Sequence, residues 1–191
     1  MKAFLSATLV ATLLQSLLAL SAQAQVMDLP PEVRAYYRNP DGSCVQCSNG
    51  MVGWWHRDLN QASLLFDTPY GRAERGGSDP ARVADYCNRR GIRAYNITGA
   101  ALTFPAMKLA CKTNRFAAIG AGGRHFQTLY GYVEGDPKPW RVCNNNSTQK
   151  IDEYTEEGFR QLHLASGAWI VVHDGPAPPS PPIPTDWWAR R

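Results

Sequence analysis

Several features that mark common functional classes are scarce in this chain of 191 residues. Its 20 basic and 16 acidic residues give a net charge of only +4, and no long basic run indicates nucleic-acid binding. A Gly-x-Ser-x-Gly motif is missing, which argues against a serine nucleophile. Cys44 and Cys47 have zinc-ligand spacing, but no second close pair of cysteines or histidines follows them. We therefore expect no metal, no cofactor and no nucleic acid.

Long apolar runs are also missing, apart from one at the start of the chain. Residues 4–20 are predominantly apolar, Lys2 is the lone charged residue nearby, and Ala-Gln-Ala at 22–24 fits a cleavage site. This pattern predicts a secretory signal peptide over residues 1–24 rather than a membrane span. We expect export to a secreted or periplasmic location, with no stable membrane insertion.

The remaining chain divides into a domain over 25–174 and a tail over 175–191. The first part is long enough for one domain with its own core. In the tail, six prolines lie close together before the ending Asp-Trp-Trp-Ala-Arg-Arg, which predicts an extended segment. Trp187 and Trp188 suit a contact either with the tail's own domain or with a partner.

Five cysteines follow the signal segment, namely Cys44, Cys47, Cys87, Cys111 and Cys143. Export permits disulfide bonds. Four of the five suffice for two bridges, which would leave one thiol free for chemistry. The sequence does not fix the pairing.

Apolar periodicity and turn residues predict helices in the first part of the domain and mostly strands in the second. Gly-Asp-Pro at 135–137 predicts a hairpin turn. The predicted helices cover 43–55, 60–66, 80–90, 104–111 and 155–164, and the predicted strands cover 92–97, 116–119, 126–133, 140–143 and 168–173. This order predicts an α+β fold in which N-terminal helices pack against a C-terminal antiparallel sheet.

The clearest chemical signal is a cysteine followed by a histidine and then by asparagines. In a thiol enzyme the thiolate attacks, the imidazole moves its proton, and an amide orients the ring. Cys44 is expected at a helix start, where N–H groups and the helix dipole favour a thiolate, and Gly42 leaves room for substrate. Cys47, one turn later, is the alternative nucleophile. Both cysteines also suit purely structural roles.

His125 is the best candidate for the base. It follows a glycine-rich approach that includes Gly123 and opens an apolar strand, so we expect it to face a cleft. The predicted hairpin returns Asn144 and Asn145 beside this strand, where either amide would hold the far ring nitrogen. Three asparagines in a row leave the choice open, and such a run is also typical of a polar turn.

These motifs resemble those of the papain-like cysteine peptidase superfamily. The resemblance covers most of the domain and implies a papain-like fold with a Cys–His–Asn triad. The matching segments are Gly-Ser-Cys-Val-Gln-Cys at 42–47, the cleft glycines Gly76 and Gly77, His125 with Tyr-Gly-Tyr at 130–132, Trp-Arg-Val-Cys-Asn at 140–144, and Glu-Glu-Gly-Phe-Arg at 156–160.

The chain departs from that family at two positions. The family's oxyanion glutamine lies six residues before the nucleophile, where this chain has Asp41 before Cys47 and Arg38 before Cys44. Asp41 is therefore the candidate for an oxyanion-binding or orienting role. Ser48 replaces the tryptophan that usually follows the nucleophile. The Gly-Ser-Cys-Val order is also similar to compact secreted bacterial papain-fold proteins, in which the first cysteine reacts, and this favours Cys44.

The sequence therefore predicts a secreted cysteine hydrolase that acts on peptide or isopeptide bonds through Cys44, His125 and Asn144. Two alternatives stay open. Because the oxyanion glutamine is missing, a catalytically degenerate papain-fold binding module that uses Trp187 and Trp188 also fits. The Cys–His pair equally suits a peptidoglycan amidase or a transglutaminase-like acyl transferase.

Overall fold

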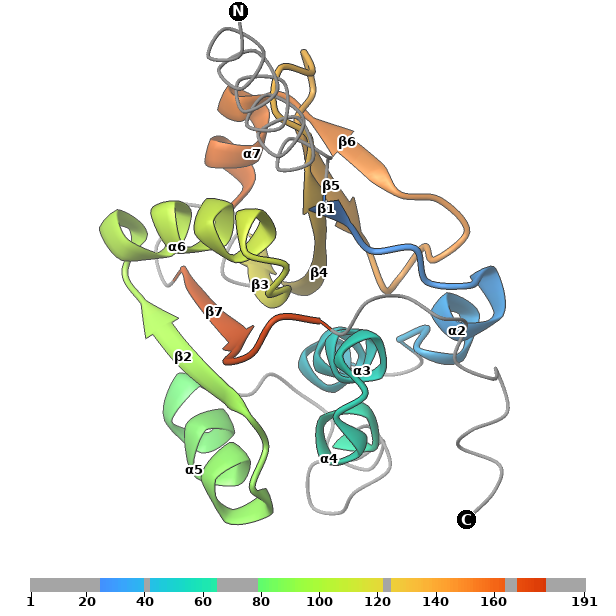
Figure 1. The fold of residues 1–191 in the computed structure, drawn as a ribbon, viewed down its shortest axis with the longest axis vertical. Coiled ribbons are helices and arrows are strands. Elements are labelled where there is room, and N and C mark those ends of the chain that lie inside the picture. The colour runs from blue at the N-terminus through green and yellow to red at the C-terminus, as the bar shows by residue number, and fades with distance from the viewer. Residues whose placement is uncertain (1–24, 40–41, 65–78, 122–124, 164–167, 178–191) are drawn as a thin grey trace, which may run out of the picture.

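Figure 1 shows the computed structural model, which describes residues 25–39, 42–64, 79–121, 125–163 and 168–177. These residues combine helices with one sheet whose strand pairs are antiparallel, and this confirms the predicted α+β class. The expected signal peptide lies outside the described residues, as do most of the expected tail and the predicted residues Asp41, Gly76, Gly77, Gly123, Trp187 and Trp188.

The elements alternate along the chain more than the sequence pattern predicts. The helices are α2 (Pro31–Tyr36), α3 (Cys44–His56), α4 (Leu59–Ala62), α5 (Pro80–Arg90), α6 (Ala100–Lys112) and α7 (Glu156–His163). The strands are β1 (Gln25–Val26), β2 (Ala94–Thr98), β3 (Ala117–Ala121), β4 (His125–Tyr132), β5 (Trp140–Cys143), β6 (Asp152–Tyr154) and β7 (Trp169–His173). Of these, α2, β1 and β6 lie in segments where the sequence predicts no element.

The strand order places β4 inside the sheet. The order is β2–β7–β3–β4–β5–β6, and β1 pairs with β4 as well. Strands β4 and β5 form the predicted hairpin, with Thr128 opposite Cys143. Because the two strands are antiparallel, the first residue of β4, His125, and the residues just after β5 lie at the same end of the sheet.

Helices cover both faces of the sheet. Successive residues of a strand point to opposite faces. Ala118 and Val171 belong to a buried cluster with α5 and the start of α3, whereas Ile119 and Val172 belong to a cluster with α6 and α7. In Figure 1, α6 and α7 occupy the upper part of the view and α3, α4 and α5 the lower part. The sheet therefore forms the middle layer.

Helix α3 runs through the interior, and all but one of its residues are buried. Two glycines let it approach its neighbours closely. A Cβ at Gly50 would lie 2.3 Å from Tyr37 Cε1, and one at Gly53 would lie 2.3 Å from the backbone nitrogen of Ala62 in α4. Glycine inside a helix costs about 1 kcal/mol relative to alanine, and this close packing offsets the cost. Cys44 therefore stands at the start of an element that is fixed along its length.

Candidate active site

A tight turn delivers Cys44 to the start of α3. Gly42 has a φ of 96°, a conformation that side-chain-bearing residues rarely adopt. Its N–H donates to Asn39 Oδ1 at 3.0 Å. Ser43 is the N-cap residue, but its side chain makes no capping bond to the first turn. The helix start therefore presents backbone N–H groups and the positive end of the dipole beside the Cys44 thiol.

The Cys44 thiol lies between the start of α3 and the start of β4. Cys44 is 8% exposed, more than any of the other four cysteines. Burial raises the pKa of this thiol, and backbone N–H groups, that of Phe126 foremost, oppose the rise. Since Phe126 directly follows His125, the thiol lies near the backbone of the strand that carries the histidine.

Asn144 holds the ring of the half-buried His125. The His125 Nε2 lies 3.0 Å from Asn144 Oδ1, and the same oxygen accepts the backbone N–H of Asn146 at 3.0 Å. Because a backbone N–H can only donate, the Asn144 atom is the amide oxygen, and the ring nitrogen facing it carries the hydrogen. The neutral ring then has its lone pair on Nδ1, so Nδ1 is the nitrogen left to accept a proton.

Asn145 serves a different purpose from Asn144. Its Nδ2 lies within 3.0 Å of three acceptors on Cys44, Ser48 and Phe126, none of which belongs to His125. The structure thus brings Asn144 to the imidazole, and it directs Asn145 to the start of α3. This division removes the ambiguity that three consecutive asparagines leave in the sequence.

Cys47, the alternative nucleophile, belongs to a different buried cluster. It is fully buried among residues that include Met27, Leu29 and Tyr37, whereas Cys44 packs in the cluster that contains Phe126. Burial raises the pKa of Tyr37, and the Cys47 thiol adds a smaller contribution. Cys47 therefore faces the apolar interior, and the structure brings Cys44 rather than Cys47 to the start of β4.

None of the five cysteines is in a disulfide bond, and all five are buried. Burial raises the pKa of Cys87 to about 11 and that of Cys143 to about 12, and it raises the pKa of Cys111 as well. These three thiols are therefore protonated at neutral pH and enclosed. Cys44 is the cysteine best placed to meet a reagent from solvent.

The three remaining histidines, His56, His163 and His173, are all buried. Burial lowers the pKa of His56 to about 3 and that of His163 to about 4. The His163 Nδ1 bonds to the backbone oxygen of Gly120. Of the four histidines, His125 is the one that combines partial exposure with a polar partner that orients its ring.

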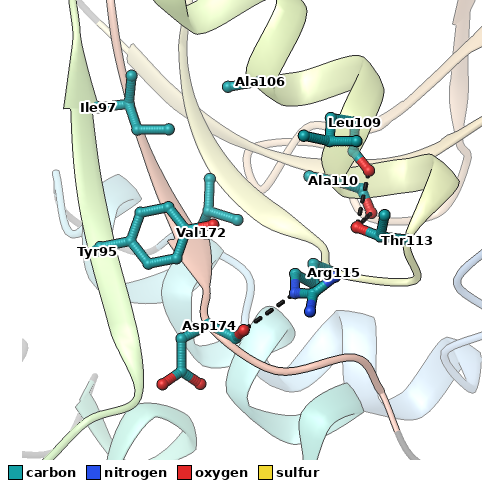
Figure 2. A pocket seen from close by; sticks show the side chains of 9 residues that line it. All are labelled: Tyr95, Ile97, Ala106, Leu109, Ala110, Thr113, Arg115, Val172 and Asp174. Atoms are coloured by element: carbon teal, nitrogen blue, oxygen red, sulfur yellow. Dashed lines mark hydrogen bonds between the residues drawn. The ribbon is translucent and has the colours of Figure 1, made fainter.

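A pocket of about 280 Å³ lies on the opposite face of the sheet, between β2, β7 and α6 (Figure 2). Tyr95 and Leu109, which line it, are exposed, and Arg115 Nε donates to the backbone oxygen of Asp174 at 3.0 Å. The lining residues are Tyr95, Ile97, Ala106, Leu109, Ala110, Thr113, Arg115, Val172 and Asp174. Since Val172 faces α6 and Cys44 packs on the other face, this pocket is separate from the candidate site.

Two contributors to the site escape motif reasoning. The Phe126 N–H is a backbone group, which any residue other than proline supplies. Asn39 joins the turn before α3 to the asparagine segment. Its backbone N–H donates to the backbone oxygen of Asn145, and its Nδ2 donates to Asn146 Oδ1, both at 2.8 Å. The only sequence signal for this role is the Asn-Pro-Asp-Gly turn that begins at Asn39.

No model of a known protein family matches the chain, and no curated protein matches it. Within the described ranges, no group of three or more histidines, cysteines, aspartates or glutamates could hold a metal ion. In the same ranges no helix is both long and apolar enough to cross a membrane. The geometry of Cys44, His125 and Asn144 is therefore what points to a function.

Proposed function

We propose that this chain is an exported thiol hydrolase of papain-like fold that cleaves peptide or isopeptide bonds. The observation that carries the proposal is the 3.0 Å contact of His125 Nε2 with Asn144 Oδ1, an oxygen that the Asn146 N–H also fixes. It supports an oriented imidazole with a basic Nδ1. A buried helix that begins with Cys44 and packs on an antiparallel sheet carrying the histidine is compatible with the papain-like arrangement.

In the proposed reaction, Nδ1 of His125 takes the Cys44 proton as the sulfur attacks the carbonyl carbon of the substrate. A buried thiol with a raised pKa needs this base, because it does not ionise unaided at neutral pH. The imidazolium then protonates the leaving amine, and the acyl group stays on Cys44 as a thioester. Water, deprotonated by the same ring, attacks the thioester, which releases the acid and restores the thiol.

Backbone N–H groups at the start of α3 are the proposed oxyanion donors. The chain has no glutamine six residues before Cys44, and the Ser43 side chain does not occupy these groups. A preorganised donor of this kind typically lowers a barrier by about 3 kcal/mol. Asn144 Oδ1 keeps accepting the Nε2 hydrogen throughout, which stabilises the imidazolium.

A catalytically inactive binding module is the second candidate, and the burial of Cys44 favours it. A thiol that is 8% exposed and has a raised pKa is inert unless a base assists it. The two candidates therefore differ in one measurable property, which is the reactivity of Cys44 at neutral pH.

The first test is alkylation of the purified folded chain with limiting iodoacetamide at neutral pH, followed by peptide mass spectrometry. The hydrolase predicts that Cys44 reacts before the other four cysteines and faster than it does in urea-unfolded protein. The binding module predicts that folding slows Cys44, because burial then protects the thiol without any assistance from a base.

The second test addresses the bond that is cleaved. A mixture of unfolded proteins is incubated with the chain, and new N-termini are identified by mass spectrometry, with Cys44→Ala as the inactive control. Cleavage that disappears in the control supports the peptidase. If the acyl group is transferred to an added primary amine faster than it is hydrolysed, the reaction is acyl transfer. Cleavage of peptidoglycan fragments, with no cleavage of proteins, identifies an amidase.

A further inference from the structure

The side chain of Asn145 lies between the two elements that carry the proposed nucleophile and base, and it is fully buried. Its Nδ2 is 3.0 Å from the backbone oxygen of Cys44, 2.8 Å from Ser48 Oγ and 2.9 Å from the backbone oxygen of Phe126. The first two acceptors belong to α3 and the third belongs to β4. One amide therefore connects the start of the helix with the start of the strand.

This connection forms where the pairing of β4 with β5 ends. The register sets Thr128 opposite Cys143, the last residue of β5. Phe126 lies two residues before Thr128, and Asn145 lies two residues after Cys143. Antiparallel geometry therefore sets Phe126 opposite Asn145, beyond the end of β5. The Phe126 N–H instead lies near the Cys44 thiol and lowers the pKa of that thiol, and the Phe126 oxygen accepts from the Asn145 amide. Because β4 and β5 stop pairing here, the backbone groups of Phe126 are available to the candidate site.

We propose that Asn145 is a positioning residue that sets the separation of the Cys44 thiol and the His125 ring. The inference rests on the proposed hydrolase function. Asn144 holds the ring and Asn145 holds the helix start, so two adjacent residues of one backbone segment place both reacting groups. A misplacement of about 1 Å between such groups slows a reaction roughly 100-fold. Loss of the Asn145 link is therefore expected to slow the chemistry of Cys44.

Asn49 offers a matched control on the same helix. It is also fully buried, its Nδ2 donates to the Val45 oxygen at 2.9 Å, and its Oδ1 accepts from Gln61 Nε2 in α4 at 3.1 Å. Asn49 thus ties α3 to α4 and not to β4. Replacing either asparagine removes buried hydrogen bonds and lowers stability. Only the replacement of Asn145 is expected to change the reactivity of Cys44.

The experiment compares the native chain with Asn145→Ala, Asn145→Asp and Asn49→Ala. Asn145→Asp keeps the side-chain shape but exchanges the Nδ2 donor for an acceptor. Alkylation of Cys44 by iodoacetamide is measured by mass spectrometry over a pH series, with thermal unfolding in parallel. We expect both Asn145 variants to react roughly 10- to 100-fold more slowly and to need a higher pH. Asn49→Ala should melt at a lower temperature with an unchanged rate and pH profile.

The outcomes separate the positioning role from the hydrolase function. Folded Asn145 variants with the native rate and pH profile overturn the positioning role and leave the hydrolase proposal standing. Equal losses of rate in the Asn145 and Asn49 variants also overturn it, because a general loss of stability then explains both. If Cys44 of the native sequence is alkylated more slowly in the folded than in the unfolded chain, the hydrolase proposal is contradicted. The positioning role of Asn145 is then contradicted as well.

Hydrogen exchange in the native chain decides the question if neither Asn145 variant folds. The side-chain amide protons of Asn145 are followed by NMR and compared with those of the exposed Asn146. Much slower exchange at Asn145 supports the link between α3 and β4. Exchange as fast as that of Asn146 overturns it, because the Asn145 amide would then be open to water rather than bonded to Cys44 and Phe126.

Discussion

The two ends of helix α3 each have a histidine nearby, and the two histidines differ in exposure and in bonding partners. At the N-terminal end, Cys44 faces the start of β4, where the half-buried His125 bonds to Asn144. At the C-terminal end, His56 is itself the last helical residue. Its buried ring stacks on that of His173, with 4.0 Å between the ring centroids.

The histidines at the C-terminal end serve structure. His56 Nε2 accepts the backbone N–H of Phe116 at 3.2 Å, and His173 Nε2 lies 3.6 Å from Asp58 Oδ2. Burial, and then the neighbouring His173, lowers the pKa of His56 to about 3. A ring that is enclosed, neutral and already engaged by the backbone cannot exchange protons with a substrate. Both ends have a histidine beside a polar partner, so access to solvent is what distinguishes the candidate site from the structural histidine pair.

The largest expected effect tests this distinction by removing a histidine from each end. His125→Ala should slow the alkylation of Cys44 at neutral pH by roughly 10²- to 10⁴-fold, the range that a general base supplies. His56→Gln is the matched control, because its side-chain oxygen can still accept the Phe116 N–H, and it should leave the rate unchanged. Rates are read from mass spectrometry of folded protein. An equal loss in both variants contradicts the contrast between the two ends.

A smaller effect should appear as acid sensitivity at the C-terminal end of α3. The pKa of His56 is lowered from 6.5 to about 3 in the folded chain, so the unfolded chain binds the proton more readily. Stability is therefore full above about pH 6.5 and falls as the pH decreases toward 3, by about 2 kcal/mol at roughly pH 5. Urea unfolding over a pH series measures this loss.

The variant His56→Gln sharpens the acid test. It should flatten the pH dependence of the unfolding free energy by the share that belongs to His56. His163, whose pKa burial lowers to about 4, contributes in the same direction and should leave a residual slope. If His56→Gln unfolds with the same pH dependence as the native chain, His56 is not the buried neutral group that the structure shows.

Much of the fold follows from local sequence signals. The Gly-Asp-Pro turn predicts the β4–β5 hairpin, and Asp79, Pro80 and Gly91 mark the two ends of α5. The short helix α2 also begins with a proline, Pro31, but it has no N-terminal side-chain cap and no glycine at its end. It is held by tertiary contacts, since Val33 is fully buried and Arg34 donates to the backbone oxygens of Thr148 and Leu29. Periodicity within the segment cannot reveal partners more than a hundred residues away.

The candidate site likewise has one part that the sequence predicts and another that depends on tertiary structure. The chain order of Cys44, His125 and the asparagines is visible in the sequence, and the hairpin brings the last two together. Which asparagine meets the ring depends on where β5 stops pairing with β4, and this is a property of the sheet. Three identical side chains in a row give no local signal for that boundary. The separate roles of Asn144 and Asn145 therefore become apparent only in three dimensions.

The smallest expected effect asks how far the chemistry extends along α3. Cys47 lies one turn inside the helix, fully buried beside Met27 and Tyr37. Cys47→Ala should cost about 1 kcal/mol of stability, since a small buried group is lost from a packed cluster. Because Cys47 packs in a different buried cluster from Cys44, the alkylation rate of Cys44 should stay at the native value. A loss of labelling in Cys47→Ala would instead identify Cys47 as the nucleophile. It would also contradict the difference in reactivity between the accessible helix start and the packed interior of the helix.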